Sequence, residues 1–197
     1  MTIEHHHNRI RVLVVEDHPV ARRGLSMLLE SFDSIALVAE ASNASQALQV
    51  MRRFPADLVI LDINLPDLNG IDLIQQLNGE FPHAKILMLS ASKQPRDISR
   101  ALAAGAVGYC HKGAEMDRCL SRAIRILTDG HYWLDSMAAT QLGSLCTIDA
   151  AHDHTFFDET ECQMLNAIAE KRCDFTESCN QQTMASIVAK LRNEKAA

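Results

Sequence analysis

The sequence predicts an α/β protein with a doubly wound parallel sheet of five strands and a small all-α domain after it. Short apolar runs such as "IRVLVV" and "DLVILD" do not alternate with polar residues, which is typical of strands buried on both faces. Segments with helical spacing of apolar residues separate these runs. In the last forty or so residues only helical spacing is found, which indicates a helical C-terminal part.

The elements follow one another in strict alternation. We expect strands at residues 10–15, 35–41, 57–62, 84–92 and 107–110, and helices at 20–31, 43–54, 71–79, 95–105 and 114–130. Asn43 suits a helix N-cap, and Gly105 suits a helix end. This alternation requires parallel crossovers with helices on both sheet faces, and the flavodoxin-like topology is the simplest one of that size.

Composition narrows the classes of protein. The chain has 197 residues, 47% of them hydrophobic, and a formal net charge of −6, which argues against a protein that coats nucleic acid. We expect a cytoplasmic protein, because no apolar run could cross a membrane and the start lacks a signal peptide pattern. The six cysteines show no CxxC pair, so we expect reduced thiols and no disulfide.

Polar side chains stand where the predicted strands end. They are Glu16, Asp17, Asp62, Ser90 and Lys112. In a doubly wound sheet the ligand site lies at these carboxyl ends, so we expect the five side chains to gather there. Three carboxylates with no nearby His or Cys favour a hard cation, Mg²⁺ above all, while lysine and serine suit a phosphoryl group. The alternative is that each acid merely caps the next helix, which is a fair interpretation for Asp17 alone.

Four motifs resemble the receiver domain of two-component response regulators: "VVEDH", "LDINLPDLNG", "LSAS" and "GYCHK". The resemblance covers residues 9 to about 130, after an N-terminal tail of residues 1–8. It implies that Asp62 accepts a phosphoryl group from a sensor histidine kinase. It also implies that Pro66 and Gly70 shape the loop after the phosphoacceptor strand.

The same resemblance assigns the remaining site residues. It implies that Mg²⁺ is held by Glu16, Asp17, Asp62 and the backbone carbonyl of Asn64. It implies phosphoryl-binding or switch roles for Ser90, Tyr109 and Lys112.

The segment "DGHYWLDSMAATQL" resembles the linker of the NarL/FixJ class, in which a LuxR-type helix-turn-helix domain follows. We therefore expect a linker at residues 131–154 and a helical output domain at 155–197. "FFDETECQMLNAIAEKR" fits the first helix of such a domain, with Glu161 at the family glutamate but Lys171 where the family usually has glycine. The stretch from Asp174 to Leu191 is about eight residues shorter than the family pattern, roughly two helical turns, so it holds one helix rather than two.

Charge in this tail also disfavours DNA. From Cys146 onward acidic residues outnumber basic ones, whereas a DNA-docking face is basic. Glutamine and asparagine can still read adenine edges, although a solvated helix face is the blander interpretation. The candidates for DNA contact are Asn180, Gln181, Gln182, Lys190 and Arg192.

Two functions remain open. One is a phosphorylation-controlled interaction protein that acts in transcriptional control through a homodimer or another regulator. The other is a conventional sequence-specific DNA-binding regulator of the NarL/FixJ class. An enzymatic output has little support in the sequence, and no membrane partner is expected.

Overall fold

The computed structural model describes residues 9–146, 157–171 and 178–194. A parallel sheet forms its centre, with strand order β2-β1-β3-β4-β5-β6. The strands are β1 (Ile10–Val15), β2 (Ile35–Ala41), β3 (Leu58–Leu61), β4 (Lys85–Ser90), β5 (Gly108–His111) and β6 (Trp133–Leu134). The expected doubly wound fold is confirmed, and the two-residue β6 extends it at the β5 edge.

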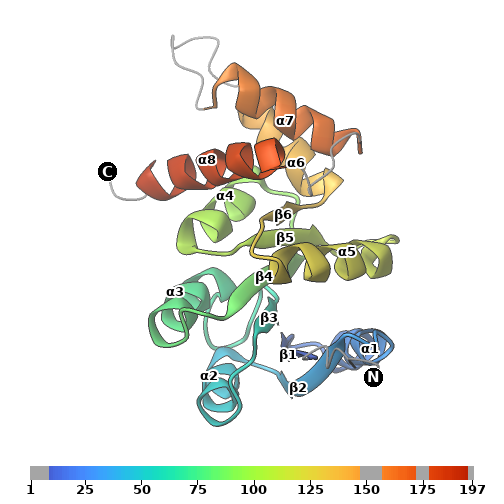
Figure 1. The fold of residues 1–197 in the computed structure, drawn as a ribbon. Coiled ribbons are helices and arrows are strands. Elements are labelled where there is room, and N and C mark those ends of the chain that lie inside the picture. Colours follow the sequence, from blue (N-terminus) through green and yellow to red (C-terminus); the bar gives the residue numbers. More distant parts are fainter. Residues whose placement is uncertain (1–8, 147–156, 172–177, 195–197) are drawn as a thin grey trace, which may run out of the picture.

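Helices cover both faces of this sheet. They are α1 (Pro19–Glu30), α2 (Ala44–Arg53), α3 (Gly70–Glu80), α4 (Pro95–Ala104) and α5 (Met116–Thr128). Figure 1 shows α2, α3 and α4 on one face and α1 and α5 on the other. The expected cap of α2 is confirmed, because the Asn43 side chain accepts a hydrogen bond from the Gln46 amide at 2.8 Å.

The strand register brings the carboxyl ends to one edge of the sheet. Val15 pairs with Leu61, and Leu61 pairs with Met88. Every residue of β3 is buried, as are the last four residues of β1. The residues that directly follow β1 and β3, Glu16 and Asp62, therefore start from rigid, neighbouring positions.

The C-terminal part is a small helical layer. It consists of α6 (Ser136–Gly143), a 3₁₀ turn (Ser144–Cys146), α7 (Glu159–Ala169) and α8 (Ser178–Glu194). Its buried apolar side chains are Ala138, Ala139, Leu142, Phe157, Met164, Leu165, Ile168, Met184, Ile187, Val188 and Leu191. The segment 131–154, which the sequence predicts as a linker, contributes β6 and α6, and its residues 147–154 lie outside the described part.

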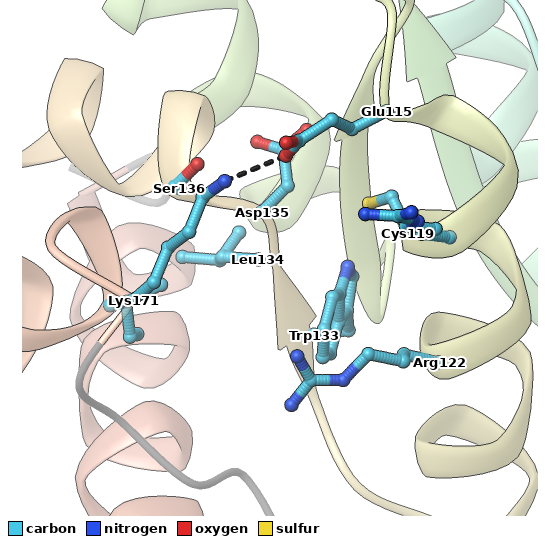
Figure 2. A pocket seen from close by; sticks show the side chains of 10 residues that line it. Glu115, Cys119, Arg122, Trp133, Leu134, Asp135, Ser136 and Lys171 are labelled. Atoms are coloured by element: carbon cyan, nitrogen blue, oxygen red, sulfur yellow. Dashed lines mark hydrogen bonds and ion pairs between the residues drawn. The ribbon is translucent and has the colours of Figure 1, made fainter.

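This helical layer contacts the sheet domain at α4 and α5. Helix α8 lies beside α4 (Figure 1), and Lys171 after α7 pairs with Glu115 before α5 at 2.6 Å (Figure 2). Lys171 has φ of 57°, a left-handed conformation that glycine adopts without strain. This backbone geometry gives a physical reason for the glycine that the family usually has there.

Helix α8 occupies residues 178–194, within the stretch for which one helix is expected. Residues 172–177 lie outside the described residues. The first helix of the tail also matches expectation, because Met164, Leu165 and Ile168 are buried on α7.

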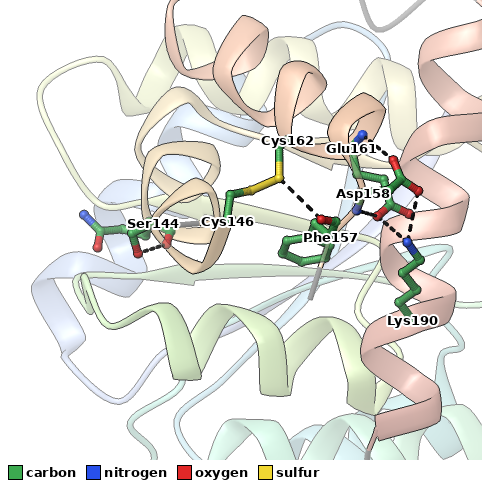
Figure 3. The surroundings of a disulfide bond; sticks show 8 residues. Ser144, Cys146, Phe157, Asp158, Glu161, Cys162 and Lys190 are labelled. Carbon is green, nitrogen blue, oxygen red and sulfur yellow. Dashed lines mark hydrogen bonds and ion pairs between the residues drawn. A yellow bond between two sulfur atoms is a disulfide. The ribbon is translucent and has the colours of Figure 1, made fainter. Parts of the chain in front are cut away.

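The prediction that every cysteine is a reduced thiol is wrong for two of them. Cys146 and Cys162 form a disulfide between the 3₁₀ turn and α7 (Figure 3). The pair is 16 residues apart and shows no CxxC spacing, so only the packing of α6 against α7 brings the sulfurs together. Among the described helices none is both long enough and apolar enough to cross a lipid bilayer.

Candidate functional site

Asp62 and Lys112 meet at the carboxyl edge of the sheet. Lys112 Nζ donates to Asp62 Oδ2 at 2.6 Å and to Glu16 Oε2 at 2.5 Å. Both carboxylates are buried, with only 6% of Asp62 and 2% of Glu16 exposed. Three side chains that are far apart in the sequence therefore form one ion cluster, as the strand-end rule predicted.

The charges in this cluster do not balance. Burial raises the pKa of Asp62, and Glu16 adds to this effect, while Lys112 opposes it. Burial would lower the pKa of Lys112, but its hydrogen bonds to Asp62 and Glu16 outweigh burial and raise it. One lysine therefore faces two buried carboxylates, with Asp17 close by, and this excess of negative charge suits a further cation.

Asp17 lies beside the cluster, and its side chain contacts His18. His18 Nδ1 is 2.7 Å from Asp17 Oδ1 and 3.3 Å from Glu16 Oε1. The sequence-based statement that no histidine is near is therefore wrong, although the "EDH" motif carried the signal. Hydrogen bonds with Asp17, then Glu16, raise the pKa of this exposed imidazole. Asn64 lies two residues beyond Asp62 and is exposed.

Ser90 ends β4 and Tyr109 is the second residue of β5, and both are fully buried. Ser90 Oγ accepts a hydrogen bond from the Ser92 amide at 3.0 Å, so it already orders the loop before α4. The Tyr109 hydroxyl makes no hydrogen bond of normal geometry, and burial raises the pKa of Tyr109 to about 12. Neither side chain makes a direct hydrogen bond to Asp62 in this conformation.

The loop after β3 is held at both ends. A Cβ atom on Gly70 would lie 2.1 Å from the backbone oxygen of Asp62, so only glycine fits there. Asp67 accepts hydrogen bonds from the Ala44 and Ser45 amides, both at 2.9 Å, and so ties the loop to the start of α2. The sequence analysis missed Asp67, although an aspartate in a Pro-Asp loop is a common helix-capping residue.

The candidates for DNA contact lie in different surroundings. Gln181 is buried against Tyr132, and Lys190 pairs with Glu161 at 2.6 Å. Arg192 Nε donates to the Leu102 carbonyl of α4 at 3.5 Å. Asn180 is half-buried and Gln182 is exposed. The structure therefore does not gather the five residues on one open face.

Comparison with known proteins adds the family. Residues 12–124 match the model of the response regulator receiver domain. A nitrate/nitrite response regulator homologue of Haemophilus influenzae is 36% identical over 119 residues, which are 60% of this chain and 57% of that protein. The transcriptional regulatory protein MctR of Rhizobium johnstonii is 33% identical over 68% of this chain and 63% of its own length. The chain thus spans less than two thirds of these two relatives.

Other matches differ in how much of the chain they cover. NarL of Escherichia coli K12 is 27% identical over 192 residues, covering 92% of this chain and 88% of NarL. The crystal structure of a LuxR-family response regulator from Aurantimonas sp. SI85-9A1 is 29% identical, with a TM-score of 0.66 over 69% of this chain and 96% of that one. A structure of RcsB from Salmonella typhimurium, 22% identical over 96% of this chain and 99% of its own, has a TM-score of 0.66 and shares the fold.

The receiver match covers more than half of the chain, and the relatives over the rest are regulators. The chain therefore belongs to the response regulator receiver domain family, and regulators of the NarL and LuxR type are among its relatives.

Proposed function

We propose that Asp62 is the phosphoacceptor of this regulator and takes its phosphoryl group from a sensor histidine kinase in the cytoplasm. The observation that carries the proposal is the position of Asp62: a buried carboxylate at a rigid strand end, 2.6 Å from Lys112. An Asp62 oxygen attacks the phosphorus of the kinase phosphohistidine. The P–N bond breaks, and its electron pair returns to the imidazole.

The oxygen donors at the site fit Mg²⁺. Carboxylates of Glu16, Asp17 and Asp62, with the backbone carbonyl of Asn64, form an all-oxygen set of the kind that this ion prefers. When bound, Mg²⁺ supplies positive charge that offsets the excess of carboxylates and the incoming phosphoryl oxygens.

Three side chains of the protein, Lys112, Ser90 and Tyr109, would bind or respond to the phosphoryl group. Lys112 already spans Glu16 and Asp62, so its ammonium group can turn from the carboxylate to a phosphoryl oxygen. The Ser90 hydroxyl donates to another phosphoryl oxygen. Tyr109, whose hydroxyl is buried beside this strand end, moves with the loop that Ser90 orders.

A chain of contacts leads from this site to the tail. Ser92 donates its amide to Ser90 Oγ and its hydroxyl to Asp97 in the first turn of α4, at 2.5 Å. Helix α4 in turn accepts the Arg192 contact from α8. A phosphoryl oxygen that accepts a hydrogen bond from the Ser90 hydroxyl draws Ser90 Oγ toward Asp62, and the Ser92 amide that donates to this oxygen moves with it, which shifts the start of α4 and the surface on which α8 lies.

The proposed output is phosphorylation-dependent protein–protein interaction in transcriptional control, through a homodimer or another regulator. Within residues 157–171 and 178–194 the tail forms α7 and one further helix, α8, whereas the LuxR-type pattern has a scaffold helix and a recognition helix after its first helix, and this difference supports the proposed output. Gln181 is buried against Tyr132, Lys190 is paired with Glu161, and Arg192 contacts the Leu102 carbonyl, so these residues are engaged with the protein itself rather than forming a free phosphate-binding face. The degeneracy of the helix-turn-helix is part of this proposal.

The alternative is conventional DNA binding by a NarL/FixJ-class regulator. Its support is the match over 88% of the length of NarL, together with the fold shared with RcsB, which a solved structure shows as dimers on DNA. That function requires α8 to leave α4, because Gln181 and Arg192 face the receiver in the present arrangement.

The test of the phosphoacceptor compares three full-length chains: native, Asp62→Asn and Asp57→Asn. Each is treated with acetyl phosphate and Mg²⁺ and weighed by intact-protein mass spectrometry. Asp57 precedes β3 at the opposite end of the same strand, so Asp57→Asn is the matched control. We expect one added phosphoryl group on the native and control chains and none on Asp62→Asn. Equal labelling of all three chains contradicts the assignment.

A second experiment separates the two outputs. The phosphorylated chain is titrated against a random-sequence DNA duplex pool in increasing salt, with fluorescence anisotropy as readout. Steep salt dependence and enrichment of one sequence support the DNA-binding alternative. Absence of binding at low salt, where non-specific contacts are strongest, supports the interaction protein.

A further inference from the structure

Two thiols meet where α5 packs against β5. Cys110 lies on β5 and Cys119 in the first turn of α5, and their sulfurs are 3.0 Å apart. This is a direct S–H···S contact between residues nine positions apart in the chain. The pairing follows from packing α5 onto β5.

The two sulfurs differ in access. Cys110 is fully buried, whereas Cys119 is partly exposed and lines a cavity of about 290 Å³ between α5, β6 and the end of α7 (Figure 2). Arg122 stacks over Trp133 at the wall of this cavity, 5.6 Å from the ring centre. A small solute that enters the cavity meets Cys119 first and finds Cys110 directly behind it.

We propose that Cys110 and Cys119 are a redox pair that a hydroperoxide converts to a disulfide. The Cys119 sulfur attacks a peroxide oxygen, the O–O bond breaks, and Cys119 becomes a sulfenic acid while one water leaves. The Cys110 sulfur then attacks the Cys119 sulfur, the S–O bond breaks, and the hydroxyl leaves with the Cys110 proton as a second water. The two thiols together lose two hydrogens, and hydrogen peroxide is reduced to two waters.

The division of roles follows from burial. Burial raises the pKa of the Cys110 thiol well above its ordinary value, which makes Cys110 a poor first nucleophile and suits it to the resolving step. Its contact with Cys119 places it where a sulfenic acid would form. A sensor cysteine beside a resolving cysteine is the arrangement that stops oxidation at the reversible stage.

A metal site is the competing interpretation of the same cluster. Asp135 has a carboxylate oxygen within 4.8 Å of both sulfurs. That carboxylate is already engaged, because it accepts hydrogen bonds from the His111 amide at 2.5 Å and the Ala138 amide at 2.7 Å as the N-cap of α6. The thiol pair is therefore better placed to react with itself than to hold an ion with Asp135.

The tryptic cleavage sites place Cys110 and Cys119 in separate peptides, so a disulfide between them can be identified by mass. Trypsin releases Cys110 in the peptide "ALAAGAVGYCHK" and Cys119 in "CLSR", while Cys146 and Cys162 share one peptide and Cys173 and Cys179 share another. The full-length chain is reduced, freed of reductant and metal, and exposed to stepwise hydrogen peroxide. Remaining thiols are alkylated, and the unreduced digest is analysed by mass spectrometry. We expect "ALAAGAVGYCHK" linked to "CLSR", released again by dithiothreitol.

Two variants and a denatured control complete the experiment. In Cys110→Ala we expect Cys119 to persist as a sulfenic acid that dimedone traps. Cys119→Ala should leave Cys110 unoxidised in the folded chain, and because Cys119 is partly exposed this variant tests the pair even if Cys110→Ala does not fold. In urea the specific link should fall at least several-fold. Peroxide treatment that leaves both peptides separately alkylated, or that links them equally well to the other cysteine peptides, overturns the proposal. Both readouts are independent of phosphorylation at Asp62.

Discussion

The Gln181 side chain of α8 makes two hydrogen bonds to the main chain of Tyr132, one with its amide and one with its carbonyl. Its Oε1 accepts the Tyr132 amide at 2.9 Å, and its Nε2 donates to the Tyr132 carbonyl at 3.4 Å. The side chain is 8% exposed, so these hydrogen bonds are shielded from water. A residue of the tail thereby fixes the segment that leads from α5 into β6.

Replacing Gln181 by alanine should release α8 from the receiver. The change leaves the Tyr132 amide without its glutamine partner in a partly buried place, which costs about 1–3 kcal/mol. We expect faster amide hydrogen exchange along α8 and at Tyr132, measured by mass spectrometry. Gln182→Ala, at the exposed neighbouring position, is the control and should leave exchange unchanged. Identical exchange in the two variants would show that the Gln181 contact does not hold α8.

Gly70 is a second position at which a single added carbon atom should destabilise the fold. In Gly70→Ala the new methyl group meets the Asp62 backbone oxygen at 2.1 Å, so the loop or α3 must shift. We expect a loss of about 1–3 kcal/mol in the free energy of unfolding, measured by urea titration. Phosphorylation of Asp62 should fall as well.

The control for this variant is Gly24→Ala in the middle of α1, where a Cβ meets nothing within 4 Å. Alanine there should stabilise the chain by about 0.5–1 kcal/mol. If both variants gain stability, the close approach of Gly70 to Asp62 is wrong.

The sequence predicted the sheet domain well for a physical reason. Buried parallel strands such as "IRVLVV" need continuous apolar residues, and their carboxyl ends must share an edge, so Glu16, Asp62 and Lys112 could be brought together without coordinates. The family resemblance then supplied roles that spacing alone does not give.

Contacts that depend on side-chain packing between distant elements could not be predicted from the sequence. The strand β6 has two residues and hence no period to detect. The disulfide between Cys146 and Cys162 and the docking of Gln181 on Tyr132 arise only once α6, α7 and α8 pack together. The position of His18 next to Asp17 in the "EDH" motif indicates that it is near the cluster, but its pairing with the two carboxylates depends on the side-chain conformation.

Asp57 gives the protein a predictable response to acid. Its carboxylate accepts hydrogen bonds from Arg11 Nε and Nη2, at 3.1 and 2.7 Å, and from the Arg11 amide. The side-chain hydrogen bonds from Arg11 hold the pKa of Asp57 below its ordinary value of 3.8. A lowered pKa means that the stabilisation is present above the unfolded value and is lost as pH falls through the folded one.

We therefore expect Asp57→Asn to lower the free energy of unfolding at neutral pH, by less and less as the pH falls below 3.8. Urea titrations of both chains over this range measure the difference. Arg11→Gln in the Asp57→Asn background should cost nothing further, because its partner is gone. A difference that stays constant with pH would mean that the ion pair does not act on stability.

Glu161 joins α7 to α8 (Figure 3), so its replacement should destabilise the C-terminal helices. Its carboxylate is 1% exposed and accepts hydrogen bonds from Ser186 Oγ at 2.8 Å, Lys190 Nζ at 2.6 Å and the Asp158 amide at 2.9 Å. Lys190 has a second partner, Asp158, at 3.0 Å, but the Asp158 side chain is 56% exposed. Glu161→Ala should lower the free energy of unfolding by about 1–3 kcal/mol, since buried donors lose their acceptor.

Double-mutant cycles that combine Lys190→Met with a change at Glu161 or at Asp158 measure how strongly Lys190 is coupled to each carboxylate. The coupling of Lys190 to buried Glu161 should be several-fold larger than its coupling to Asp158, because water and salt screen the exposed pair. Raising the salt concentration should shrink the Asp158 coupling first. Equal couplings would show that the buried carboxylate does not govern the α7–α8 contact, and the tail would then depend on its apolar core alone.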